Sequence, residues 1–340
     1  MGMAYLIDAP SCSMIKVAVW AALVVSGGAL RAPSPGKIAV IGASGGTGQR
    51  AVLGLLDDPS LLKPSDLRVL SRDPSKPACS ALRRLGVETV RADLDEPASL
   101  EAALAGARAV YVHGTGAEAK QADLEEVPRA KRLAAAMRAA GVPTAAYNSA
   151  ADPPSAGIDR AIQKRDVEQA FADAGIGGVD LRATLFMEEL WKSYTRPAVL
   201  SGKFPFSVPP DRPVSLTCVR DMGRLAAAAL CGADGAGDSS PRRAVDVASD
   251  VLTPAQIASA FGAAQGAQVA HRQNRALYYA SRVLLPELYR ITRHYRKTHV
   301  PVDVAELEAA FPGLALTRFA AFLEETGWAD STKTYADLAL

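Results

Sequence analysis

The clearest chemical signal in this sequence is a group of closely spaced glycines. The segment "KIAVIGASGGTGQRAVLGLL" runs from an apolar stretch through the glycines into residues with helical spacing. A strand that turns tightly into a helix leaves free backbone N–H groups at the positive end of the helix dipole, which suits a phosphate. Glycine is needed because a Cβ would obstruct the turn, the approach of a pyrophosphate or the packing of helix on strand. The alternative is a glycine-rich turn in an ordinary α/β protein. We expect a dinucleotide to bind at this turn, which comprises Gly42, Ser44, Gly45, Gly46, Thr47 and Gly48.

The residues after the second apolar run indicate which dinucleotide. "LRVLS" at 67–71 is followed by "SRDPSK", so that Arg72 and Lys76 stand where NAD-binding domains usually place an acidic residue. An arginine at this position suits a 2′-phosphate, whereas a carboxylate holds the free ribose hydroxyls. Asp73 comes one place later, between the two cations. Arg72 could also be a solvated loop residue, but we favour a phosphate contact and predict NADP(H) over NAD(H).

A lysine stands on the inward side of a later helix. In "AIQKRDVEQAFADAGI", Lys164 lies three residues before Val167 and seven before Phe171, so it shares their apolar stripe. Glu168 follows at i+4, and a surface Lys–Glu pair is therefore the alternative interpretation. We favour a lysine that reaches toward the ligand crevice.

Strands and helices alternate along the chain in a way that would position these groups. Predicted strands at 38–41, 67–71, 88–94, 108–114, 144–150 and 178–184 are separated by helical segments, which predicts an α/β protein with a doubly wound parallel sheet. Ligands in such sheets bind beyond the carboxyl ends of the strands. The side chains expected along that crevice are Asp93, His113, Gly114, Thr115, Asn148 and Ser149.

Composition narrows the class of protein. The 340 residues are 49% hydrophobic and 22% charged with a formal charge of +2, which fits a globular protein and gives no reason to expect nucleic acid. The cysteines and histidines show no metal-ligand spacing, so we expect neither a metal nor a disulfide framework.

The first 34 residues differ from the rest. Lys16 precedes an apolar core and a run of small residues ending at Ala29, a pattern typical of a signal peptide and too short for a membrane span. Met1 or Met14 could be the start. We expect a targeting leader at 1–34, with an organelle (a plastid-type one among the candidates) or otherwise the cytoplasm as destination. A nucleotide-binding domain is expected at 35–198 and a substrate-side portion at 199–340, with 214–250 returning to the sheet.

The substrate-side portion has two features of its own. Asp221 is a candidate N-cap for a helix at 222–231. Residues 275–297 predict a helix that is kinked at Pro286 and carries several tyrosines, of which Tyr289 or Tyr295 could line a substrate pocket.

Eight segments together resemble the NmrA-like family, an atypical branch of the short-chain dehydrogenase/reductase superfamily. They are "GASGGTGQRAV", "SRDPSK", "ADLDEPASLEAAL", "AAYNSAAD", "KRDVEQAFADAGI", "LRATLFMEELW", "VRDMGRLAAAAL" and "FPGLALTRFAAFLEETGW", and they span 37 to about 329. The resemblance implies a Rossmann fold with a smaller, partly helical C-terminal portion, and a preference for NADP(H). It places Asp93 and Leu94 beside the adenine. It also brings Thr115, Asn148 and Lys164 toward the nicotinamide ribose, and it lays Phe186 and Met187 over the ring.

The sequence departs from the superfamily at one catalytic position. The usual Tyr-x-x-x-Lys pair would need tyrosine at 160, where this chain has Arg160. One hypothesis is an NADPH-dependent reductase of a small apolar carbonyl or quinone-like compound, with Lys164, Asn148 or a bound water supplying the proton. Another is a non-catalytic NADP(H) sensor that acts through a protein partner. An NAD-linked sugar epimerase is a weaker third, because such enzymes also need the absent tyrosine.

Overall fold

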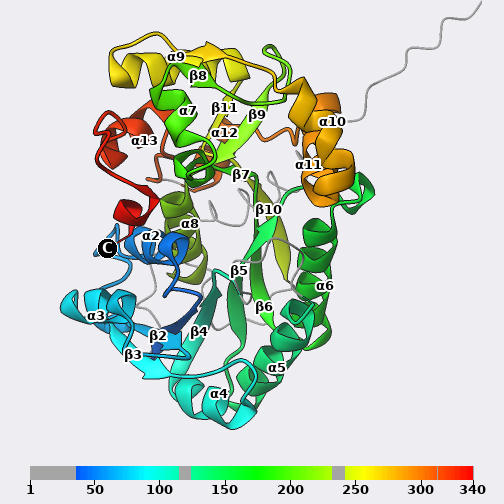
Figure 1. Ribbon diagram of the computed structural model, residues 1–340. Coiled ribbons are helices and arrows are strands. Elements are labelled where there is room, and N and C mark those ends of the chain that lie inside the picture. The colour runs from blue at the N-terminus through cyan, green and yellow to red at the C-terminus, as the bar shows by residue number, and fades with distance from the viewer. Residues whose placement is uncertain (1–35, 115–123, 232–241, 312, 340) are drawn as a thin grey trace, which may run out of the picture.

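The computed structural model describes residues 36–114, 124–231, 242–311 and 313–339. The expected leader and Thr115 lie outside the described residues. Figure 1 shows a sheet with helices on both faces and, beyond one end of its strands, a smaller part that contains most of the C-terminal elements. None of the described helices has the length and apolarity that crossing a bilayer requires.

The larger part is built on a seven-stranded sheet in the order β10-β6-β5-β4-β1-β2-β3. All neighbouring strands in it run parallel. The strand order reverses direction between β1 and β4, and ligands of open α/β sheets bind at such a point. The Rossmann-like fold expected from the sequence is therefore confirmed. The strands are β1 (Lys37–Ile41), β2 (Leu67–Ser71), β3 (Glu88–Arg91), β4 (Ala107–Val112), β5 (Thr144–Ala150), β6 (Gly177–Ala183) and β10 (Arg243–Val247).

Each face of this sheet has its own hydrophobic core because side chains alternate along the strands. Ile38 and Val40 of β1 pack under one layer of helices, whereas Ala39 and Ile41 pack under the other. The first layer contains α2 (Gly46–Leu55), α3 (Pro77–Arg84), α8 (Val219–Cys231) and α12 (Val304–Ala310), and the second contains α4 (Pro97–Leu104), α5 (Glu126–Ala139) and α6 (Asp159–Asp173).

The smaller part has a separate aromatic core. Trp191 and Trp328 meet edge to face with ring centroids 5.2 Å apart, and Phe261 packs on Trp328 at 4.5 Å. It contains a three-stranded sheet β11-β9-β7 and a two-stranded sheet β12-β8. Its elements are β7 (Leu185–Phe186), η3 (Met187–Trp191), α7 (Arg196–Leu200), β8 (Lys203–Phe204), β9 (Val214–Thr217), β11 (Asp250–Leu252), α9 (Pro254–Gln265), β12 (Ala270–His271), α10 (Arg275–Leu284), α11 (Pro286–Lys297), α13 (Phe319–Thr326) and η4 (Tyr335–Leu338). Two further short turns are η1 (Pro64–Asp66) and η2 (Pro154–Ala156).

Two local expectations are corrected by the structure. Residues 275–297 form two helices rather than one kinked helix, because Pro286 occupies the first position of α11 and Leu285 separates it from α10. Asp221 is not an N-cap, since α8 begins at Val219. Its fully buried carboxylate instead accepts hydrogen bonds from the Thr317 N–H at 2.8 Å and the Ser249 hydroxyl at 2.6 Å.

Candidate functional site

The glycine turn joins β1 to α2 at the point where the strand order reverses. Gly42 has φ +85°, and a Cβ there would stand 2.8 Å from the Gly114 carbonyl oxygen. A Cβ on Gly48 would come within 2.0 Å of the Gly42 oxygen, so this contact between helix and turn requires glycine. Among the described residues a Cβ on Gly45 would meet only the Gly42 oxygen, at an ordinary contact distance of 3.8 Å, and Gly45 itself is exposed.

The N-terminus of α2 is open to a ligand. Gly45 is its N-cap residue, and no side chain in the described part of the chain caps the helix. Ser44 and Thr47 border the turn and are half-buried. Since the first backbone N–H groups of a helix have no partner within it, this end offers donors and a positive dipole to an anion. The Tyr335 ring of η4 would lie 3.6 Å from a Cβ placed on Gly46. The C-terminal segment therefore borders the glycine turn.

Hydrogen bonds connect the turn to the ends of the two adjacent strands. The His113 Nε2 lies 3.2 Å from the Thr47 hydroxyl, and its Nδ1 lies 3.1 Å from the Tyr111 hydroxyl. The Asn148 amide donates to the His113 carbonyl oxygen at 2.9 Å. The other amide atom of Asn148, Oδ1, is buried and receives no hydrogen bond from a described residue. A buried acceptor without a donor is costly, which makes it a natural contact for a ligand hydroxyl.

His113 is held neutral in this setting. Burial, aided by the nearby positive charge of Lys164, lowers its pKa to about 4. A neutral imidazole both donates and accepts one hydrogen bond, which matches its two hydroxyl neighbours. His113 therefore orders Thr47 and Tyr111 rather than carrying charge.

Lys164 points to a carboxylate on a different helix. Its Nζ lies 2.6 Å from Oε1 of Glu126 in the first turn of α5, and 5.2 Å from the centre of the Tyr147 ring. The Tyr147 hydroxyl donates to the same Glu126 oxygen at 3.4 Å. Burial, together with the negative charge of Glu126, raises the pKa of Tyr147 well above its usual range.

The alternative pair of Lys164 with Glu168 is not the arrangement seen. Glu168 is buried, accepts hydrogen bonds from the Ser149 hydroxyl, and pairs with Arg182 and Arg165. These partners hold the pKa of Glu168 below its usual value despite burial. Lys164 is thus free of Glu168 and is held by Glu126.

Position 160 lies at the start of α6, on its exposed side. The Arg160 side chain is 49% exposed, and its Nε lies 4.0 Å from Glu287 of α11. Its backbone N–H also donates to Glu287 at 3.2 Å. The residue that replaces the superfamily tyrosine therefore joins α6 to α11.

The residues expected at the adenosine end lie on exposed loops after β2 and β3. Arg72 and Lys76 are exposed, and neither forms an ion pair with a described residue. The Asp73 carboxylate between them accepts hydrogen bonds from both the N–H and the hydroxyl of Ser75, and these bonds lower its pKa. Asp93 and Leu94 are half-buried at the end of β3. Because the Asp73 carboxylate is hydrogen-bonded to Ser75, Arg72 and Lys76 remain available to bind a phosphate.

The structure separates the two residues expected over the nicotinamide ring. Phe186 is half-buried, whereas Met187 is fully buried and packs in the aromatic core of the smaller part. A fully buried side chain has no surface to lay over a ring, so of this pair Phe186 alone presents one. Thr115, expected near the ribose, lies outside the described residues.

Sequence reasoning missed a buried ion pair behind the glycine turn. Arg50 of α2 donates from Nε to Oε1 of Glu188 at 3.0 Å, and Glu188 also accepts from the Val219 N–H at 3.1 Å. Burial raises the pKa of Glu188 to about 7, although Arg50 opposes the shift. The pair ties the cofactor-side helix to the smaller part. Glu126 and Tyr335 were missed as well, because contacts between distant segments leave no local pattern.

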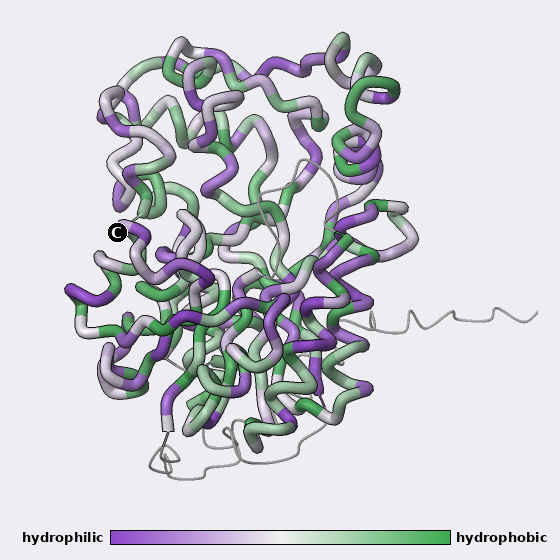
Figure 2. Tube along the Cα trace, turned by 60° about the horizontal axis from the view of Figure 1, so that its bottom comes forward, coloured by the Kyte–Doolittle hydropathy of each residue, from purple (hydrophilic) through white to green (hydrophobic). Residues whose placement is uncertain are grey.

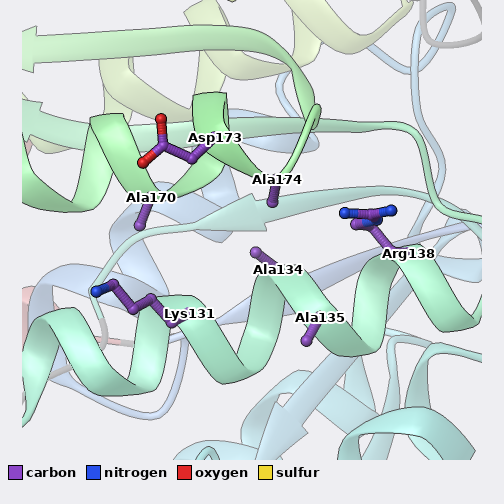
Figure 3. A pocket seen from close by; sticks show the side chains of 7 residues that line it. All are labelled: Lys131, Ala134, Ala135, Arg138, Ala170, Asp173 and Ala174. Carbon is purple, nitrogen blue, oxygen red and sulfur yellow. The ribbon is translucent and has the colours of Figure 1, made fainter.

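A surface groove lies elsewhere on the molecule. It has a volume of about 410 Å³ and runs between the C-terminal halves of α5 and α6. Figure 3 shows Lys131 and Arg138 on α5 and Asp173 on α6 around alanines from both helices. These helix halves lie toward the amino ends of the strands, so the groove is remote from the glycine turn. Among the described residues no group of three histidine, cysteine or acidic side chains could hold a metal ion.

Known proteins match this chain in sequence and in fold. The model of the NmrA-like family matches residues 34–296. This chain belongs to the NmrA-like family. A relative in Streptomyces griseus, named (4-alkanoyl-5-oxo-2,5-dihydrofuran-3-yl)methyl phosphate reductase, is 32% identical over 57% of this chain and 63% of its own length.

Solved structures share the fold of this family member at low identity. Citrobacter sp. triphenylmethane reductase, solved with NADP(H), has a TM-score of 0.69 and 19% identity, over 85% of this chain and 99% of that one. An NADPH-dependent quinone oxidoreductase from Escherichia coli has a TM-score of 0.65 and 21% identity, over 85% and 98%. Both are similar in fold along nearly their whole length.

Proposed function

We propose that this NmrA-like protein is an NADP(H)-dependent oxidoreductase that reduces a small apolar carbonyl or quinone-like compound. The observation that carries the proposal is the meeting of four features at one sheet edge: the open glycine turn, the unsatisfied Asn148 Oδ1, the Glu126-held Lys164, and the unpaired Arg72. The similar proteins from Streptomyces griseus, Citrobacter and Escherichia coli are named as reductases or oxidoreductases, which supports the same class of reaction.

The residues at the glycine turn and at the adjacent strand ends fit NADP(H). A Cβ would fill the space in front of Gly45, and the uncapped α2 terminus offers backbone donors to a pyrophosphate. Arg72 and Lys76 are free to meet a 2′-phosphate, and Asn148 Oδ1 is free to meet a ribose hydroxyl. Lys164, held by Glu126, would offer its remaining donors to the same ribose. When bound, NADPH supplies a hydride.

The chain's own groups have separate tasks in such a reaction. The glycine turn orients the dinucleotide, while the half-buried Phe186 borders the site from the smaller part. Reducing a carbonyl to an alcohol consumes one hydride and one proton. The Lys164 ammonium donates a hydrogen bond to Glu126, and because Lys164 is also a predicted ribose contact we assign this proton to it. Water completes the transfer if the Lys164 ammonium does not reach the substrate oxygen.

The test is turnover of NADPH with a panel of quinones and aldehydes by the purified protein, beside calorimetric binding of NADPH and NADH. We expect oxidation above background with at least one apolar acceptor, and tighter binding of NADPH. Lys164→Ala should keep NADPH binding within about tenfold and lose most turnover. Binding without turnover by the parent protein across the panel would contradict the enzymatic proposal.

A second candidate is a non-catalytic NADP(H) sensor, favoured by Arg160 where the superfamily has its tyrosine. Arg160 and Glu287 connect α6 to α11, so a ligand that shifts α6 would also move the smaller part. A sensor should change its oligomeric state or capture a partner when it binds NADP+ or NADPH. Identical size-exclusion and pull-down behaviour with and without either ligand would remove this candidate.

A further inference from the structure

Helices α10 and α11 form a hairpin at the edge of the smaller part (Figure 1). They pack through their tyrosines, with the Tyr278 and Tyr289 ring centroids 5.2 Å apart and the Arg296 guanidinium 4.6 Å from the Tyr278 ring. The hairpin turns at Leu285, and Tyr295 near its base is buried. Its turn therefore stands away from the aromatic core that its base joins.

The turn of this hairpin exposes large apolar side chains. Val283 is 80% exposed, Leu284 75% and Tyr279 69%, and Leu285 and Leu288 are exposed by more than 40% each. Five of the nine large exposed hydrophobic residues in the described part of the chain thus lie within residues 279–288. In Figure 2 the outer turns of the hairpin, at the upper right, are strongly hydrophobic. Contiguous exposure of this kind marks a binding surface rather than a random scatter.

The same hairpin carries a strong positive charge. Residues 272–297 contain seven arginines and lysines and a single acid, Glu287. Arg290 pairs with Glu287 and Asp159, and Arg296 donates to the Ser207 carbonyl. The remaining five cations form no ion pair with a described residue and are exposed: Arg272, Arg275, Arg282, Arg293 and Lys297.

The cations and the apolar residues lie side by side. Arg275 and Arg282 are seven residues apart in α10, and Tyr279 and Val283 are four apart, so the helical repeat brings all four onto one exposed arc. The other side of α10 faces α11 through Tyr278. A helix with this arrangement, apolar at its tip and basic beside it, has the character of an interfacial membrane helix.

We propose that the α10–α11 hairpin docks the protein on an anionic lipid surface, with Leu284 and its neighbours entering the interface and the five unpaired cations meeting lipid phosphates. Charge complementarity selects this partner, because unpaired cations are spread along both helices of the hairpin, from Arg272 to Lys297, and Glu287 is the only acid in this stretch. Phosphates of nucleic acid would satisfy the cations but leave the apolar tip in water. An acidic protein and a second copy of the chain are alternative outcomes of the test. The inference does not depend on hydride transfer.

The first experiment is sedimentation of the full chain with vesicles of phosphatidylcholine alone or with 30% phosphatidylglycerol. Three variants are compared: Leu284→Glu/Leu285→Glu at the tip, Arg275→Gln/Arg282→Gln on the arc, and Leu85→Glu, a control on the exposed leucine that directly follows α3. We expect the parent and the control to bind only the anionic vesicles, and both hairpin variants to lose tenfold or more in affinity. Binding carried by the segment before residue 36, which all variants keep, would leave them equal and overturn the proposal.

A second experiment reports on the tip itself and stays informative if a variant binds weakly for another reason. The fluorescence of Leu284→Trp, minus that of the parent, should shift to the blue with anionic vesicles, and 0.5 M NaCl should reverse the shift. An unchanged difference spectrum, in a protein whose circular dichroism matches the parent, would overturn the proposal. So would a salt-dependent dimer that buries the tryptophan without lipid, or a blue shift with an acidic protein that vesicles do not reproduce.

Discussion

The ammonium of Lys164 lies 2.6 Å from Oε1 of Glu126, and 38 residues separate the two in sequence. Glu126 is 9% exposed and Lys164 21%, so this pair is stronger than a solvated surface bridge yet not fully desolvated. The Glu126 carboxylate thereby fixes the position of the ammonium group of Lys164, the only lysine of α6.

The first prediction concerns the coupling between these two side chains. Lys164→Met should lower the free energy of unfolding by roughly 2–3 kcal/mol, because it leaves the buried Glu126 charge without its cation. Adding Glu126→Gln should restore most of that loss, giving a coupling of about 1–2 kcal/mol in a double-mutant cycle. Urea unfolding at pH 7 measures all four proteins. Additive effects would mean that the pair contributes nothing specific.

The second prediction concerns the 2′-phosphate. Arg72→Ala should weaken NADPH binding by roughly 1.5–3 kcal/mol, the scale of a hydrogen bond to a charged group, and leave NADH binding almost unchanged. Arg84→Ala is a matched control, since Arg84 is also exposed on the same helix-loop surface. Calorimetry with both nucleotides measures the difference. Equal losses for NADPH and NADH would show that Arg72 acts without recognising the phosphate.

The third prediction follows from the neutral state of His113. Its pKa is lowered to about 4 in the folded protein against 6.5 as its ordinary value, so between these values the unfolded chain binds more protons. The contribution of His113 to the free energy of unfolding should therefore fall as the pH drops from about 6.5 toward 4, by about 3 kcal/mol in total. Burial raises the pKa of Glu188 to about 7 and of Asp180 to about 6, which gives the opposite slope.

Comparing the parent with His113→Gln separates these effects, because both carboxyl groups are present in each protein. The stability of the parent relative to the variant should decline as the pH falls from 6.5 to 4, in urea titrations at half-unit steps. A constant difference across this range would mean that His113 titrates normally in the folded state.

The sequence was sufficient for features that have a local signature. The apolar run ending at Gly42 predicted a strand, a turn and a helix start, because glycine spacing and side-chain period are set within one segment. The alternation of strands and helices predicted the parallel sheet for the same reason. Arg72 could be singled out since its place after β2 follows from the fold.

Other features depend on contacts that no local pattern records. Glu126 reaches Lys164 only because α5 and α6 are neighbours on one face of the sheet. Met187 and Phe186 are adjacent in sequence, but Met187 is buried in the aromatic core, whereas Phe186 is half-buried against the core of the large sheet. The position of Tyr335 beside Gly46 likewise requires the whole C-terminal part to fold back onto α2.

The fourth prediction contrasts two glycines of one turn. Gly48→Ala should lower the free energy of unfolding by about 2–3 kcal/mol or more, because its Cβ would stand 2.0 Å from the Gly42 oxygen and the backbone must move. Gly45→Ala should change stability by less than about 0.5 kcal/mol, since its Cβ meets nothing closer than 3.8 Å and its φ of −85° suits alanine. Its methyl group would still fill the space in front of the turn, so NADPH affinity should fall at unchanged stability. Thermal unfolding and calorimetry on both variants separate the two effects, and a Gly45→Ala protein that binds NADPH like the parent would place the pyrophosphate away from this turn.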